Sequence, residues 1–125
     1  MNEIIRAKEA PEAIGPYSQA VKTGNMIFVT GLIGINPETG KLVSNDVGEQ
    51  ARQTLKSICA ILKEAGATPA NVVKATIFLA DMADFAEVNK IYAEVFTRDC
   101  PARSCVEVSR LPLNAKVAIE SIAVI

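Results

Sequence analysis

The stretch MIFVTGLIGI, residues 26–35, and the turn cluster NPETG that follows it at residues 36–40 give the first clear indication of the fold. The ten residues are apolar almost throughout and rich in β-branched side chains, and they end where Asn, Pro and Gly gather, which predicts a buried β-strand. Gly31 interrupts this strand. A glycine inside a strand indicates a bulge or the close approach of another backbone, so we expect an irregularity at this position.

Residues 46–65, a short way along the chain, have a helical period. Their apolar side chains recur at intervals of three and four residues, which places them on one face of a helix. Asp46 with Glu49 three residues later forms a capping signature at the start, while Gly66 and then Pro69 mark the end. We therefore predict a helix with one buried face.

The rest of the chain repeats this order of strand and helix. The further expected elements are a strand at residues 71–80, a helix at about residues 81–96, and strands at residues 103–109 and 116–125. A hairpin is expected around Gly15 and Pro16 ahead of them. The sequence predicts a single α+β domain over residues 1–125, in which two helices pack on one face of a mixed sheet.

The opposite face of this sheet is also expected to be apolar. The predicted strands read as nearly continuous hydrophobic runs instead of an alternation of polar and apolar residues. Two helices can cover only one face, and a large apolar surface needs a cover. We expect that cover to be another copy of the chain.

Composition narrows the possible functions. The chain has 13 Lys and Arg against 14 Asp and Glu, with the basic residues scattered, so it lacks the electrostatic footprint of a nucleic-acid binder. Its apolar runs are too short for a membrane span, and charges stand where a signal peptide would be apolar, so a cytoplasmic location is expected. The absence of histidine and of any C-x-x-C pair argues against a metal site, and three cysteines do not suggest a disulfide framework.

Two charged residues on the last strands are the first candidates for chemistry. Glu120 projects with Ala118 and Ile122 into apolar surroundings, where a carboxylate needs a cation or a water molecule beside it. Arg103 is the expected partner in the adjoining strand, and its planar guanidinium could grip a ligand carboxylate through two parallel hydrogen bonds. From these residues alone, a structural ion pair between Arg103 and Glu120 is favoured over a ligand site.

Four other polar residues have both a structural and a functional interpretation. Asn89, at the edge of an apolar helix stripe, is expected to bond nearby backbone, and Cys105 is expected to be a packed thiol because no histidine could activate it. Tyr17 is either a mobile lid or an aromatic anchored in a turn. The strand propensity of threonine is enough to account for Thr30.

Five ordered segments give the chain a resemblance to a known family. They are AIGPYSQA at residues 13–20, FVTG at 28–31, DFAEVN at 84–89 with Tyr92 and Phe96, PARSCVEV at 101–108 with Leu111-Pro112, and Ile119-Glu120. Together they resemble the RidA family of reactive intermediate deaminases, formerly called YjgF, from about Ala10 to Val124. Thr30 departs from the serine found in many deaminating members and would add a methyl group to the pocket wall.

The resemblance implies a chorismate-mutase-like fold and a homotrimer whose sheets face inward, with three sites at the subunit interfaces. In such a site Arg103 would clamp the carboxylate of the substrate, and Glu120 would hold or activate water. The remaining residues implied to line the substrate pocket are Tyr17, Thr30, Gly31, Asn89 and Cys105.

The implied reaction is the hydrolysis of 2-imino acids to 2-keto acids and ammonia, which would limit damage by reactive metabolites without a cofactor or metal. These imines form from the enamines 2-aminoacrylate and 2-aminocrotonate, which pyridoxal-phosphate dehydratases release. The imine carbon is already electrophilic, so orientation and a directed water molecule are the main requirements. The alternatives are a non-catalytic sensor that binds small 2-keto acids, and a ribonuclease or translation inhibitor, which the charge balance disfavours.

Overall fold

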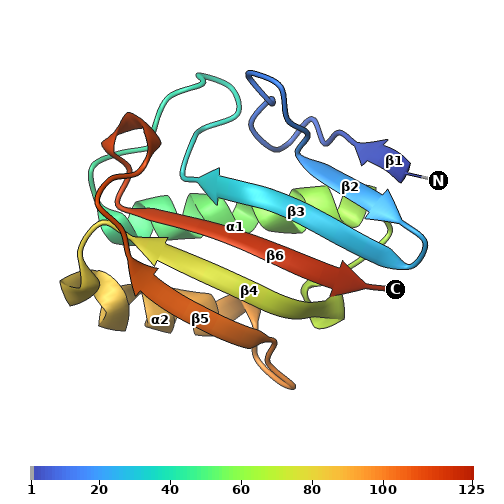
Figure 1. The fold of residues 1–125 in the computed structure, drawn as a ribbon. Helices are drawn as coiled ribbons and strands as arrows, with labels where there is room; N and C mark the ends of the chain where they lie inside the picture. Colours follow the sequence, from blue (N-terminus) through green and yellow to red (C-terminus); the bar gives the residue numbers. More distant parts are fainter. Residues whose placement is uncertain (1) are drawn as a thin grey trace.

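The strand predicted around Gly31 is β3 (Met26–Ile33), and it lies inside a six-stranded sheet whose order is β1-β2-β3-β6-β4-β5 (Figure 1). The computed structural model describes residues 2–125. Its other elements are β1 (Asn2–Ile5), β2 (Ala20–Thr23), α1 (Val47–Glu64), β4 (Val72–Leu79), α2 (Phe85–Val95), β5 (Ala102–Glu107) and β6 (Val117–Val124), with 3-10 turns at Pro69–Asn71, Met82–Asp84 and Pro112–Asn114.

The sheet is mixed, as predicted. Strands β4 and β5 are parallel and are joined by the crossover helix α2, while every other pair of neighbours is antiparallel. Both helices lie on the same face, with α1 behind β3 and β6 and α2 behind β4 and β5 (Figure 1). This confirms the predicted α+β architecture with two helices on one face of a mixed sheet.

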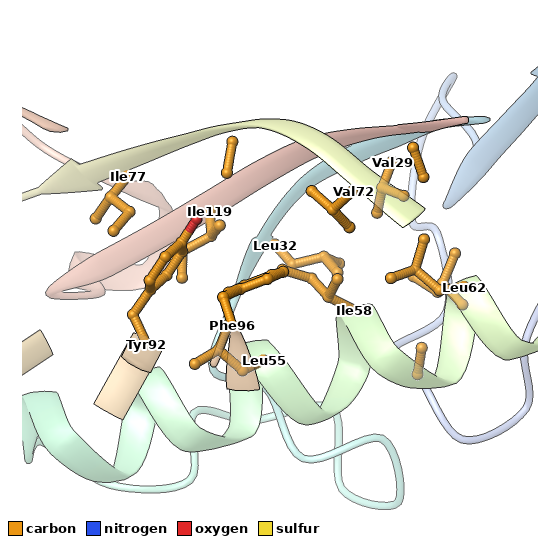
Figure 2. Packing of buried hydrophobic residues seen from close by; sticks show 14 of the residues in the cluster. Val29, Leu32, Leu55, Ile58, Leu62, Val72, Ile77, Tyr92, Phe96 and Ile119 are labelled. Atoms are coloured by element: carbon orange, nitrogen blue, oxygen red, sulfur yellow. The ribbon is translucent and has the colours of Figure 1, made fainter. Parts of the chain in front are cut away.

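Capping and packing explain why α1 begins and ends where it does. The side chain of Asp46 accepts a hydrogen bond of 2.8 Å from the backbone N–H of Glu49, as the capping signature predicted. The helix gives way to Gly66 at φ 84, a left-handed conformation that favours glycine. Figure 2 shows Leu55 and Ile58 of this helix packed beneath the strands. The amphipathic face found in the sequence is therefore the face that forms the core.

The amino-terminal prediction was right about the pairing and wrong about the turn. β1 and β2 pair antiparallel, but the tight hairpin lies between β2 and β3 at Gly24, whose φ is 58. The segment with Gly15 and Pro16 belongs to a long connection held by the buried side chain of Gln19. That side chain accepts from Ala7 N–H over 2.6 Å and donates to the Pro11 carbonyl over 2.6 Å. A Gly-Pro pair bends the chain locally, but a buried amide closes this loop.

The irregularity predicted at Gly31 is a bulge. Val29 pairs with Ser121 and Leu32 pairs with Ile119, so the two residues between them on β3 oppose Glu120 alone. A Cβ built at Gly31 would have no atom within 4 Å, so no other part of the chain approaches the glycine closely.

The face of the sheet opposite the helices is uncovered in the single chain, and it is apolar as predicted. Along β6 the side chains alternate, with Ile119 buried at 0% exposure and Glu120 exposed on the other side. On that bare face Phe28 is 40% exposed and Val106 is 42% exposed.

No helix among residues 2–125 has the length and apolar character needed to cross a membrane.

Candidate functional site

Arg103 lies on the helix-facing side of the edge strand β5, where α2 packs against it. Its Nη1 donates a hydrogen bond of 2.8 Å to Oδ1 of Asn89. The guanidinium carbon lies 4.8 Å from the centroid of the Tyr92 ring and 5.6 Å from that of Phe85. Asn89 therefore holds one nitrogen of the guanidinium, and two aromatic rings lie within cation–π distance of it.

No carboxylate neutralises this guanidinium within residues 2–125. The ion pair that these residues do form joins Arg52 and Glu94 on the exposed surfaces of the two helices. A half-buried arginine that is held in position but lacks an acidic partner is suited to receive an anion from outside. The arrangement makes Arg103 a candidate binding group for a carboxylate.

Asn89 does not behave as its position at a helix edge suggested. We expected its amide to bond nearby backbone, and that expectation was wrong, because its oxygen accepts from Arg103 on another element. Phe85 and Tyr92 belong to a segment that carries the family resemblance, and neither was expected to contact Arg103. Spaced four residues before and three residues after Asn89, they share its helix face, and this spacing was the available signal that all three could meet one cation.

Glu120 belongs to a second group of residues on the bare face of the sheet. Glu120 is on β6, and its neighbour on one side is Thr76 of β4. On the other side it lies opposite the bulge of Thr30 and Gly31 in β3. Ser104 of β5 continues the same row beyond Thr76. Glu120 and Thr76 also line a hollow of about 290 Å³. A carboxylate thus stands beside hydroxyl groups and Lys74 in a largely apolar surface, where it can hold water.

The predicted pairing of Arg103 with Glu120 on adjoining strands is wrong for the single chain. β4 lies between β5 and β6, and Arg103 faces the helices whereas Glu120 faces away from them. Two strand spacings amount to about 10 Å, with the sheet itself between the side chains. The error arose because strands that follow each other in sequence were taken as neighbours, whereas the largely buried β6 lies in the middle of the sheet.

Tyr17 and Cys105 complete the set of predicted site residues. Tyr17 is 50% exposed and its hydroxyl accepts from Ile14 N–H over 3.3 Å, which makes it an aromatic anchored in a turn. It also lines a hollow of about 510 Å³ in the amino-terminal segment. Cys105 packs partly buried against the core, two residues after Arg103. Burial raises the pKa of its thiol and nearby Arg103 opposes the rise, and a raised pKa is the opposite of the shift that activates a cysteine nucleophile.

The predicted residues therefore form two groups. Arg103, Asn89 and Cys105 lie between β5 and α2, while Thr30, Gly31 and Glu120 lie across β3 and β6 on the other face. Within the described part of the chain, we find no group of three or more Cys, Asp or Glu side chains that could hold a metal ion. Within a single chain, the candidate carboxylate-binding group and the candidate water-holding group thus do not meet.

Comparison with known proteins identifies the family. The family model described as Endoribonuclease L-PSP matches residues 7–125. A protein of Escherichia coli K12 named 2-iminobutanoate/2-iminopropanoate deaminase is 50% identical over 127 residues, which cover 99% of this chain and 98% of that one. The chain belongs to the L-PSP/RidA family. The resemblance found in the sequence is confirmed.

Two further relatives agree with membership of the RidA family. The chloroplastic Reactive Intermediate Deaminase A of Arabidopsis thaliana is 53% identical over 121 residues, covering 97% of this chain and 65% of the plant protein, so the chain spans about two thirds of that relative. The crystal structure of Escherichia coli TdcF with bound serine superposes with a TM-score of 0.94 at 43% identity, covering 98% of each chain.

Proposed function

We propose that this RidA-family protein hydrolyses small 2-imino acids to 2-keto acids and ammonia without a cofactor. The observation that carries the proposal is Arg103, a half-buried guanidinium held by Asn89 and two rings with no acidic partner among residues 2–125. The relatives named as deaminases, at 50% and 53% identity, support this reaction. The serine bound to the similar TdcF structure supports a small ligand with a carboxylate.

The chemistry follows from the two groups of residues. Arg103 uses one of its five N–H donors on Asn89, and a neighbouring pair can bind the two oxygens of the substrate carboxylate. Glu120 then accepts a proton from the water molecule as its oxygen adds to the imine carbon, and it returns that proton to the substrate nitrogen to give a carbinolamine. Loss of the hydroxyl proton forms the C=O bond of the 2-keto acid as the C–N bond breaks, and the nitrogen takes up that proton and leaves as ammonia. Orientation of a reactive carbon and a directed water supply the rate enhancement.

The proposed site lies between two copies of the chain. In one chain the carboxylate-binding and water-holding groups face opposite sides of the sheet, so a neighbouring copy is needed to bring them together. The exposed apolar face with Phe28 and Val106 supplies a surface for that contact. A homotrimer with inward-facing sheets would cover this face and form three sites, each completed by Tyr17, Thr30, Gly31 and Cys105.

A coupled assay tests the proposal. Purified protein is mixed with a threonine dehydratase and threonine, and the release of 2-ketobutyrate is followed over time. We expect the protein to speed that release and Arg103→Ala to lower kcat/KM by about a hundredfold, the order of loss for one preorganised charge contact. Arg52→Ala is the matched control, because Arg52 is an exposed arginine on the outer side of α1. Equal rates with and without the wild-type protein would refute the deaminase.

The alternatives give different results in the same experiments. A sensor of 2-keto acids would bind 2-ketobutyrate in calorimetry, lose that binding in Arg103→Ala, and leave the coupled assay unchanged. The endoribonuclease activity in the family description has less support here, because the net charge is −1 and the sequence contains no histidine. We propose a cytoplasmic location for the single-domain enzyme, which agrees with its three free cysteines, and a functional link to the pyridoxal-phosphate dehydratases that supply its imines.

A further inference from the structure

Two aromatic rings of α2 lie beside the guanidinium of Arg103. Tyr92 is 4% exposed, and its ring centroid lies 4.8 Å from the guanidinium carbon. Phe85 is half-buried and offers a second ring at 5.6 Å. Both separations are within the range at which a cation is attracted to the face of an aromatic ring.

The hydroxyl group of Tyr92 does not explain why this residue is here. Its Oη is buried and makes no hydrogen bond to any atom of residues 2–125. The ring has two neighbours, the core and the guanidinium. It meets the ring of Phe96, the residue that follows α2, at 4.5 Å between centroids, and Figure 2 shows the Tyr92 side chain reaching toward the sheet near Ile119. Arg103 also acts on Tyr92 electrostatically, since it opposes the rise that burial causes in the tyrosine pKa.

A single hydrogen bond cannot by itself orient a guanidinium. The bond to Asn89 fixes one nitrogen and leaves rotation about that contact. A ring face beneath the planar group restricts this rotation, because stacking contact is lost when the plane tilts. Bidentate binding of a carboxylate depends on that angle, since both oxygens must meet N–H donors at once.

We propose that Tyr92 is a positioning residue that sets the plane of Arg103 for carboxylate binding, with Phe85 as a weaker second support. This inference rests on the proposed function, because it gives Arg103 the role of substrate clamp. Tyr92 would then influence substrate affinity although its side chain is buried in the core. Tyr92 does not touch the substrate and acts through the arginine.

Three variants separate this role from a structural one. Tyr92→Leu removes the ring beneath Arg103, and Tyr92→Phe keeps it. Phe96→Leu removes a ring that is also buried, at 5% exposure, but that has no cation–π contact with Arg103. For each variant we would measure kcat and KM per mole of folded protein in the coupled assay, the calorimetric Kd for 2-ketobutyrate, and the thermal unfolding midpoint.

We expect Tyr92→Leu to raise KM and the Kd for 2-ketobutyrate by about three- to thirty-fold, the range of one cation–π contact, with a smaller change in kcat. Tyr92→Phe should restore both constants to within about twofold of wild type. Phe96→Leu should lower the unfolding midpoint and leave KM unchanged. If Tyr92→Leu does not fold, Phe85→Leu takes its place, with a smaller expected rise in KM.

The inference is overturned if removing the ring beneath Arg103 leaves KM and Kd unchanged, or if Phe96→Leu raises them as much as Tyr92→Leu does. The proposed function fails in a different way. A wild-type protein that binds 2-ketobutyrate without accelerating its release refutes the deaminase, while the Kd series still decides the role of Tyr92. A wild type with neither binding nor activity overturns both.

Discussion

Two variants that are each inactive should restore activity when they assemble together. Arg103→Ala removes the proposed carboxylate-binding group, and Glu120→Gln removes the proposed base that would accept a proton from water. Within one chain these residues lie on opposite faces of the sheet with β4 between their strands. If every site combines Arg103 of one copy with Glu120 of the next, a mixed oligomer can contain intact sites.

The size of the restored signal follows from this geometry. A site is intact only where the copy that supplies Arg103 is the Glu120→Gln variant and the copy that supplies Glu120 is the Arg103→Ala variant. With equal amounts and random assembly, each condition holds for half of the positions. About a quarter of the sites should therefore be intact, whatever the number of copies in a closed ring.

The assay needs exchange of subunits. The two variants are mixed in equal amounts in denaturant and refolded together, and the coupled dehydratase assay is compared with that of each variant refolded alone and of wild type refolded alone. We expect about a quarter of the refolded wild-type activity in the mixture. A mixture no more active than the mean of the two separate variants would refute a site shared between copies.

Two further predictions concern packing and ionisation. A Cβ at Gly34 would lie 2.6 Å from the backbone carbonyl oxygen of Gln50, so Gly34→Ala should lower the free energy of unfolding by about 1–3 kcal/mol and lower the thermal midpoint. Gly48→Ala should cost less, because its Cβ would meet the flexible end of the Glu87 side chain. Equal midpoints for the two variants would contradict this prediction. Burial raises the pKa of the Cys105 thiol, so only a small part of it is thiolate at pH 7.5. Iodoacetamide should therefore label the exposed Cys100 before Cys105 at this pH, and the labelling rate of Cys105 should increase as the pH rises. Peptide mass spectrometry that finds equal rates at pH 7.5 would count against it.

The positions of the elements could be read from local patterns because their causes are local. The capping residue Asp46 and the stop at Gly66 set the limits of α1 to within a residue of the prediction. The bulge at Gly31 was signalled by a glycine inside an apolar strand. In contrast, the tight turn at Gly24 was missed in favour of Gly15, because Gly15-Pro16 and Gly24-Asn25 are both turn signals and only the pairing of β2 with β3 distinguishes them.

The candidate site shows the same division between residue identity and arrangement. The residue types and the resemblance together indicated Arg103 and Glu120, but not which faces of the sheet they occupy relative to each other. The sequence also did not predict that Asn89 accepts a hydrogen bond from Arg103 or that the ring of Tyr92 lies beside the guanidinium. Each depends on α2 lying against β5, and this contact joins residues about a dozen positions apart through a crossover connection.

By itself, the sequence determined which segments become strands and helices, which sides of them are apolar, and which family the chain resembles, since these follow from the period of side chains and from short motifs. The tertiary structure decided that β6 lies between β3 and β4, and that Arg103 and Glu120 are therefore separated by the sheet. The physical reason is that strand order depends on burying whole faces against the helices. That burial is a sum over the entire sheet, and no single stretch of residues contains it.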